Sequence, residues 1–198
     1  MASERPDRSV LTDAELVRCI LGGEADAFGE FVRRTQRQAY RLARRLTRNH
    51  EDADDVLQES YVKAYRALDR LDPKRPFTPW FYTIVSRTAL SLLRSGKVRA
   101  AESLDEPGPE GEDSLGQRVA DPRGNPAALD RWIDADRAYA RLSEEHRVVL
   151  ALRVEGDLSY DEIAETLGLP VGTVMSRLAR AREALLAMMD EVKRAPRS

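Results

Sequence analysis

Residues 158–185 read LSYDEIAETLGLPVGTVMSRLARAREAL, and this stretch predicts two helices joined by a tight turn. Ser159 and Glu162 have the S-x-x-E spacing of a capping box, which marks the start of the first helix. Gly168 is the residue type favoured just past a helix end. The stretch therefore predicts a helix-turn-helix over about residues 159–182.

The second helix of this stretch separates an apolar stripe from a polar, basic face. The apolar positions recur at helical spacing, namely Val174, Leu178, Ala181, Leu185 and Met188. The opposite face gathers Gly172, Thr173, Ser176, Arg177 and Arg180. Short side chains allow close approach to a major groove, and arginines bind phosphates or guanine edges. This face indicates binding to duplex DNA, whereas the alternative is an ordinary helical hairpin with a solvated basic face.

Composition places the chain among ordinary globular proteins and excludes several classes of site. Its 198 residues hold one cysteine, Cys19, and two histidines far apart in sequence, so neither a disulfide within the chain nor a cysteine-rich zinc site is expected. No apolar run is long enough to cross a membrane, and the N-terminus lacks the apolar core of a signal peptide. We expect a cytoplasmic protein without cofactor, metal or catalytic residues, and not an enzyme.

Strand signals are nearly absent, so the fold class is predicted to be all-α. Thr12 suits the N-cap of a first helix that ends before Gly22. Two more helices are expected over residues 25–48 and 51–68. A fourth is expected to be capped by Thr78, with Pro79 at its first position and its end near Gly96.

A change in composition divides the chain into two small helical domains. Residues 101–127 hold two basic residues against seven acidic ones, with several prolines, which is typical of a segment that buries no core. The predicted organisation is a flexible N-terminus (1–9), a first domain (10–97), a flexible acidic linker (98–127), a second domain (128–190) and a flexible C-terminus (191–198).

Residues 52–68, DADDVLQESYVKAYRAL, form a helix whose two faces differ in character. The inward stripe comprises Ala53, Leu57, Tyr61, Ala64 and Leu68. The other face carries Asp55, Gln58, Glu59 and Val62. Charged residues on such a face favour simple solvation, while an exposed valine among them indicates a partner surface as the alternative.

Residues 76–97, PFTPWFYTIVSRTALSLLRSGK, place an aromatic ring and cations in one sector of a helix. The inward positions are Phe81, Ile84, Val85, Thr88 and Leu92. The opposing sector holds Trp80, Thr83, Arg87, Ser91 and Arg94, with Lys74 and Arg75 in the preceding loop. Rings that stack on bases and arginines that follow the backbone suit single-stranded DNA. The alternative is that Trp80 packs against the second helix and that the arginines only solubilise the surface.

These three segments, in this order, resemble the bacterial sigma factors of the extracytoplasmic-function group. The resemblance covers about residues 10–97 and 128–190. It implies that residues 52–68 belong to sigma region 2 and grip the clamp helices of the RNA polymerase β′ subunit. It implies that residues 76–94 read and melt the downstream (−10) promoter element, and that the helix-turn-helix of region 4 binds the −35 element.

The resemblance also implies roles for single residues and partners. Core polymerase would be contacted by Asp55, Gln58 and Glu59. The downstream element would be contacted by Lys74, Arg75, Trp80 and Arg87. The basic face of the last helix would contact the upstream element. Implied partners are core RNA polymerase (β′ and β subunits), promoter DNA and an anti-sigma protein, with no insertion into a membrane. Two positions depart from the family pattern: Met175 stands where a basic residue is common, and Arg87 where asparagine is frequent.

The leading hypothesis is therefore a transcription-initiation factor that acts by binding. The alternative is a stand-alone helix-turn-helix regulator whose N-terminal half senses a ligand or a protein. A nucleic-acid enzyme is a third class, and the sequence shows no constellation of catalytic residues for it.

Overall fold

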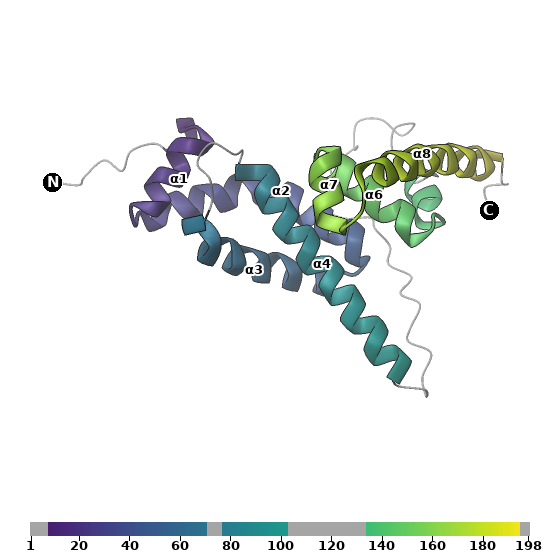
Figure 1. Ribbon diagram of the computed structural model, residues 1–198, viewed down its shortest axis with the longest axis horizontal. Coiled ribbons are helices and arrows are strands. Elements are labelled where there is room, and N and C mark those ends of the chain that lie inside the picture. The colour runs from purple at the N-terminus through teal and green to yellow at the C-terminus, as the bar shows by residue number, and fades with distance from the viewer. Residues whose placement is uncertain (1–7, 71–76, 103–133, 195–198) are drawn as a thin grey trace. The chain divides into compact units, whose positions relative to one another are not determined.

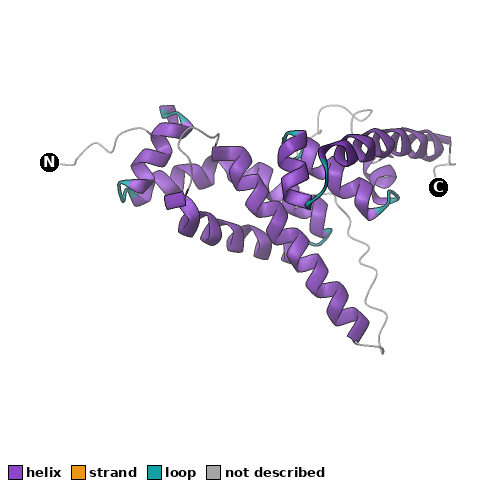
Figure 2. Ribbon diagram, in the orientation of Figure 1, coloured by secondary structure: helices purple, strands orange, loops and turns teal. Residues whose placement is uncertain are grey.

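The computed structural model describes residues 8–70, 77–102 and 134–194, and all regular elements within these ranges are helices (Figures 1 and 2). The predicted all-α fold is confirmed. The elements are η1 (Arg8–Val10), α1 (Asp13–Leu21), α2 (Ala25–Thr47), α3 (His50–Ala67), η2 (Leu68–Arg70), α4 (Phe77–Glu102), α6 (Glu144–Val154), α7 (Tyr160–Leu167) and α8 (Val171–Arg194). Residues 134–140 are also helical. The chain divides after Glu102 into two compact units, and most of the predicted linker, from residue 103 onward, lies outside the described residues.

Local capping signals mark the starts of α1 and α3 in the first unit. The Thr12 side chain accepts a hydrogen bond from the Glu15 amide at 3.3 Å, and the Glu15 carboxylate accepts one from the Thr12 amide at 2.8 Å. The Thr12 hydroxyl also donates to this carboxylate at 2.8 Å, and the bonds from the Thr12 amide and then from its hydroxyl hold the pKa of Glu15 below its usual value. Asn49 caps α3 by accepting from the Glu51 amide at 3.0 Å. The predicted Thr12 cap is confirmed because a capping box depends only on residues three apart.

Both predicted ends of α4 were wrong. The helix begins at Phe77, so Thr78 lies inside its first turn instead of capping it. The Thr78 hydroxyl instead donates to Asp13 of α1 at 3.1 Å. At the other end α4 continues past Gly96 to Glu102, because one glycine costs a helix only about 1 kcal/mol and the residues after it are mostly good helix formers.

Helical residues extend into both ends of the chain that were predicted to be flexible. Arg8 and Ser9 form η1, and their backbone carbonyls accept hydrogen bonds from Arg34 at 2.9 and 3.1 Å. At the other end of the chain α8 extends to Arg194. The hydrogen bonds from Arg34 hold η1 against α2. The last residues of α8 are polar, but most of them favour a helix, so the helix continues through them.

An aromatic cluster forms the core of the first unit, where α2, α3 and α4 pack against one another (Figure 1). The Phe31 ring of α2 lies 4.1 Å from the Phe77 ring and 5.0 Å from the Phe81 ring, measured between centroids. Tyr61 of α3 stacks on Phe81 at 4.8 Å. Its hydroxyl lies 3.0 Å from the Thr35 hydroxyl, and burial raises the pKa of Tyr61 against the effect of that hydrogen bond.

The predicted inward stripes are largely confirmed. Ala53 and Ala64 of α3 and Leu68 of η2 are buried, as are Phe81, Val85 and Thr88 of α4. The remaining predicted inward positions, which are only half-buried, are Leu57, Tyr61, Ile84 and Leu92. Buried positions that the stripes omitted are Val56, Ser60, Phe77, Tyr82, Ser86, Ala89 and Leu90. Since α4 contacts α1, α2 and α3, its buried surface is wider than one stripe.

The second unit contains the predicted helix-turn-helix. Ser159 and Glu162 form the capping box of α7, and Gly168 ends that helix in the left-handed region at φ 66°. Val174, Leu178 and Ala181 of α8 are buried against α6 and α7. The later stripe positions Leu185 and Met188 are half-buried.

Two glycines near this turn give a paired stability prediction. Gly168→Ala is expected to lower the free energy of unfolding by about 1 kcal/mol, because an L residue is strained at positive φ. Gly172→Ala is expected to be neutral or to raise it by up to about 1 kcal/mol, because Gly172 is helical with open space where a Cβ would stand. Urea unfolding of both variants measures the difference, and equal effects would contradict this account of the turn.

Candidate binding surfaces

The outward side of α3 carries the four residues that the sequence predicted for it. Asp55, Gln58 and Glu59 are exposed, and Val62 is 49% exposed. These positions share one side of the helix because they are spaced by three, four or seven residues. The structure therefore places three polar residues and the apolar Val62 on one surface, called here the α3 surface.

Tyr65 extends the α3 surface and was missed by the sequence interpretation. It is 60% exposed, and its ring meets the Phe28 ring edge-on with the centroids 5.1 Å apart. Tyr65 follows Gln58 by seven residues and Val62 by three. Helical spacing alone could therefore have placed Tyr65 on this face. The core thus supports one edge of an exposed ring, as in apolar patches that bind other proteins.

Glu59 already has a partner on its own helix. Its carboxylate lies 2.7 Å from the ammonium of Lys63, which also donates to the Thr88 hydroxyl of α4 at 3.2 Å. Both charged side chains remain about half exposed. This contact links the α3 surface to α4 and limits the rotamers of Glu59, while leaving the carboxylate accessible to a further cation.

The second predicted surface lies along α4. Arg87, Ser91 and Arg94 are exposed, and Trp80 and Thr83 are half-buried. The Thr83 hydroxyl donates to the Pro79 carbonyl at 3.1 Å, so it is turned toward its own helix. Lys74 and Arg75, predicted to belong to the same surface, lie outside the described residues.

Trp80 rests on an aromatic support. Its ring stacks on Phe77 with centroids 5.3 Å apart and an interplanar angle of 24°, and Phe77 in turn contacts Phe31 of α2. The indole is therefore neither fully buried nor loose on the surface. A half-buried ring whose other parts remain accessible suits stacking on an unpaired base.

The third surface is the N-terminal half of α8. Gly172, Ser176 and Arg180 are exposed, while Thr173 and Arg177 are half-buried. A Cβ at Gly172 would meet nothing within 4 Å, so packing within the described chain does not require glycine there. Met175, 53% exposed, lies beside these residues. The predicted residues thus share one accessible face at the start of the helix.

Arg177 has a partner within its own unit. Its guanidinium lies 3.3 Å from the Glu145 carboxylate of α6, and the Arg177 side chain is less exposed than the Glu145 side chain. The Ser176 hydroxyl donates to the Thr173 carbonyl at 3.0 Å. The face thus combines one restrained arginine with the freely exposed Arg180.

Other kinds of site were sought over the same described ranges. Residues 8–70, 77–102 and 134–194 contain no group of three or more His, Cys, Asp or Glu side chains that could hold a metal ion. Within these ranges, none of the helices has both the length and the apolar character needed to span a bilayer. The candidate sites are thus surfaces built from helix faces.

Comparisons with known proteins match both units. The family model for Sigma-70 region 2 matches residues 31–99, and that for Sigma-70, region 4 matches residues 133–185. The chain is 31% identical over 179 residues to the ECF RNA polymerase sigma factor SigW of Bacillus subtilis (strain 168), covering 89% of this chain and 96% of that one. It is 35% identical over 178 residues to the ECF RNA polymerase sigma-E factor of Escherichia coli (strain K12), covering 88% and 93%.

Two solved structures share the fold. CnrH, in complex with the cytosolic domain of CnrY, has a TM-score of 0.62 and 28% identity, covering 90% of this chain and 97% of that chain. The sigma factor RpoE from Bartonella quintana, in complex with the anti-sigma factor NepR, has a TM-score of 0.61 and 22% identity, covering 82% and 96%.

Proposed function

This chain belongs to the extracytoplasmic-function group of RNA polymerase sigma factors, and from that membership we propose that its three candidate surfaces divide the work of promoter opening. A sigma factor is a transcription-initiation factor and not an enzyme. The observation that carries the proposal is that an exposed acidic and apolar face and a helix-turn-helix lie in the region 2 and region 4 matches of one chain. A stand-alone helix-turn-helix regulator would not require a region 2.

The α3 surface is proposed to dock on the clamp helices of the β′ subunit. Asp55 and Glu59 offer carboxylates to cations on the polymerase, while Val62 and Tyr65 supply apolar area at the centre of the contact. Charged rims raise the rate of association and select the partner, and buried apolar contacts slow dissociation. The α3 surface offers both features on adjacent helical turns.

The α4 surface is proposed to capture the downstream element as a single strand. Trp80 offers a ring for a base that has left the duplex, and Arg87 and Arg94 follow the backbone. Lys74 and Arg75 are proposed to join them from the preceding loop. Strand separation then draws its energy from binding, because holding the unstacked base offsets the cost of unpairing it.

The start of α8 is proposed to enter the major groove of the upstream element. In a helix-turn-helix the N-terminal residues of the second helix contact base edges. Gly172, Thr173 and Ser176 are small enough for close approach, and Arg177 and Arg180 supply cations. The β subunit is proposed as the further polymerase contact that holds region 4 in place.

We also propose control by an anti-sigma protein in the cytoplasm. CnrH, a relative with 28% identity, was solved in complex with the cytosolic domain of another protein, CnrY. A binder that covers the α3 surface would block docking without affecting the fold.

Reconstitution tests the proposed function directly. Purified chain is combined with core RNA polymerase and genomic promoter fragments, and opened thymines are detected by permanganate. The expected result is a bubble at selected sites only when both proteins are present. Sequence-specific binding by the chain alone, with no change in polymerase start sites, would support the stand-alone regulator instead.

Two arginines of α8 are expected to give different defects. Arg177→Ala is expected to cost about 1–3 kcal/mol of upstream binding and to relax base preference at one position, because Arg177 lies nearer the helix start. Arg180→Ala is expected to weaken binding to all sequences alike and to reduce its salt dependence, as loss of a phosphate contact does. Holoenzyme binding to duplexes with single base changes measures both.

Arg182→Ala serves as the matched control. Arg182 is an exposed arginine on the same helix but lies away from the proposed DNA face. Equal losses for all three variants would show that only net charge matters.

A further inference from the structure

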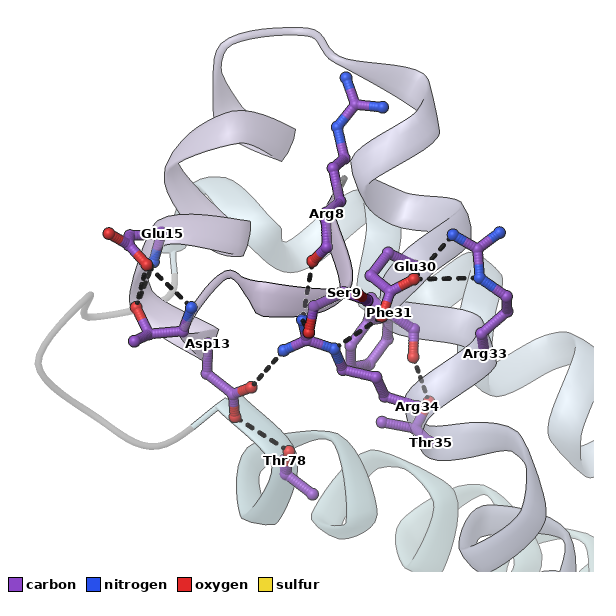
Figure 3. A network of polar contacts seen from close by, with 11 residues as sticks. Arg8, Ser9, Asp13, Glu15, Glu30, Phe31, Arg33, Arg34, Thr35 and Thr78 are labelled. Carbon is purple, nitrogen blue, oxygen red and sulfur yellow. Dashed lines mark hydrogen bonds and ion pairs between the residues drawn. The ribbon is translucent and has the colours of Figure 1, made fainter. Parts of the chain in front are cut away.

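Arg34 of α2 connects three parts of the first unit through its guanidinium (Figure 3). Its Nη2 donates to the carbonyls of Arg8 and Ser9 in η1 at 2.9 and 3.1 Å. Its Nη1 donates to Asp13 Oδ1 of α1 at 3.4 Å. The side chain is mostly buried, so these contacts hold it in one orientation.

Glu30 fixes the same guanidinium from within α2. Its Oε1 accepts from Arg34 Nε at 2.9 Å, and its Oε2 accepts from Arg33 at 2.7 Å. Glu30 is only 6% exposed, and the hydrogen bond from Arg34, followed by that from Arg33, lowers its pKa. Glu30 therefore stays ionised near neutral pH and keeps Arg34 aimed at η1 and α1.

Asp13 extends this network to α4. While its Oδ1 faces Arg34, its Oδ2 accepts a hydrogen bond from the Thr78 hydroxyl at 3.1 Å (Figure 3). Thr78 lies 65 residues away in sequence and belongs to the first turn of α4. The Asp13 carboxylate, which Arg34 holds through one oxygen, therefore restrains the start of α4 through its other oxygen.

The first turn of α4 has a second anchor, Phe77. This ring is 1% exposed and lies against Phe31 in the core. Adjacent helical residues point about 100° apart, so Phe77 and Thr78 together fix both the position and the rotation of this turn. Trp80, two residues after Thr78, stacks on Phe77, and its direction depends on that rotation.

We propose that Asp13 and Thr78 are positioning residues for single-strand capture. They hold the start of α4 so that Trp80 presents its ring at a fixed angle to an unstacked base. The proposal rests on the function assigned above to the α4 surface. Groups that bind a reacting or displaced base need support from surrounding residues, because small displacements weaken their contacts.

A purely structural role makes a different prediction. If Asp13 only stabilised α1, its loss would act through global stability, and any α1 variant of equal stability would have the same effect. If it positions Trp80, its loss weakens single-strand binding even when the chain is fully folded. The two roles separate when stability and binding are measured on the same variants.

The test uses four variants of the full chain in complex with core polymerase. Thr78→Val removes only the hydroxyl, Thr78→Ser retains it, Asp13→Ala removes the acceptor, and the fourth combines Thr78→Val with Asp13→Ala. Glu15→Ala is the matched control, because Glu15 is a carboxylate of α1 that accepts hydrogen bonds from the amide and the hydroxyl of Thr12. The probe is the fluorescently labelled non-template strand of a promoter that the wild-type holoenzyme opens.

We expect Thr78→Val and Asp13→Ala each to weaken strand binding roughly 3- to 10-fold, the range of one hydrogen bond. The double variant should lose little more than either single variant, because both remove the same contact. Thr78→Ser and Glu15→Ala should bind as the wild type, and core polymerase affinity should not change. In the chain without polymerase and in a Trp132→Phe background, where Trp80 is the only tryptophan, Thr78→Val should also lower the fluorescence anisotropy of Trp80.

Other outcomes would overturn the proposal. Wild-type strand affinity for Thr78→Val, additive losses in the double variant, or an equal loss for Glu15→Ala would each show that the contact does not position Trp80. If the wild-type holoenzyme opened no promoter at all, the proposed function itself would be wrong.

Discussion

Replacing Phe31 by alanine is expected to lower the free energy of unfolding of the first unit by about 3–5 kcal/mol. The ring is 1% exposed and contacts Phe28, Tyr61, Phe77 and Phe81, which come from all three central helices. Its removal leaves a cavity that these aromatic neighbours cannot fill without leaving their own positions. Urea unfolding followed by circular dichroism measures the loss.

Phe28→Ala provides the comparison for this prediction. Phe28 is half-buried at the edge of the same cluster, so its removal should cost clearly less. A loss below about 1 kcal/mol for Phe31→Ala would mean that the cluster is not the centre of this unit. The second unit should unfold unchanged in both variants.

Charge reversal at Glu59 is expected to be the most damaging surface change for polymerase binding. Glu59→Lys replaces an attraction with a repulsion inside a proposed interface, which costs about 2–5 kcal/mol, or roughly 30-fold or more in affinity. The fold should survive, because the exposed ion pair of Glu59 with Lys63 contributes at most about 1 kcal/mol. Fluorescence titration against core polymerase without DNA gives the affinity.

Asp190→Lys is the control for net charge. Asp190 is exposed near the C-terminal end of α8, far along that helix from its proposed DNA face, and its reversal changes the net charge by the same amount. It should bind core polymerase as the wild type does. If Glu59→Lys kept full affinity while folded, docking through the α3 surface would be ruled out.

Local signals were enough to predict the helix-turn-helix. Ser159, Glu162 and Gly168 act on backbone groups within a few residues of themselves, so their effect does not depend on the rest of the fold. The same holds for the Thr12 cap of α1. The sigma-factor family was predicted because three such segments occur in a characteristic order, and the family matches confirm it.

Tertiary contacts explain where the sequence interpretation was wrong or incomplete. Thr78 is a residue type that commonly caps helices, but its hydroxyl donates to Asp13 instead. No local sequence pattern shows that Asp13, 65 residues earlier, lies next to Thr78. Ser60 and Ser86 are buried because each hydroxyl donates to the carbonyl four residues before it, at 2.6 and 2.7 Å, which removes the cost of burying it. The binding roles of the surface residues remain predictions, since a helix face alone does not identify its partner.

Under the proposed contact of Arg177 with the upstream element, its ion pair with Glu145 has a consequence for binding to non-cognate DNA. A phosphate of any sequence must compete with a carboxylate that already neutralises this guanidinium at 3.3 Å. Random duplex therefore gains little from Arg177, whereas a guanine that accepts two hydrogen bonds can displace or share the carboxylate. In this proposal Glu145 lowers the gain from non-cognate duplex more than the gain from cognate sites, which compete with a large excess of genomic DNA.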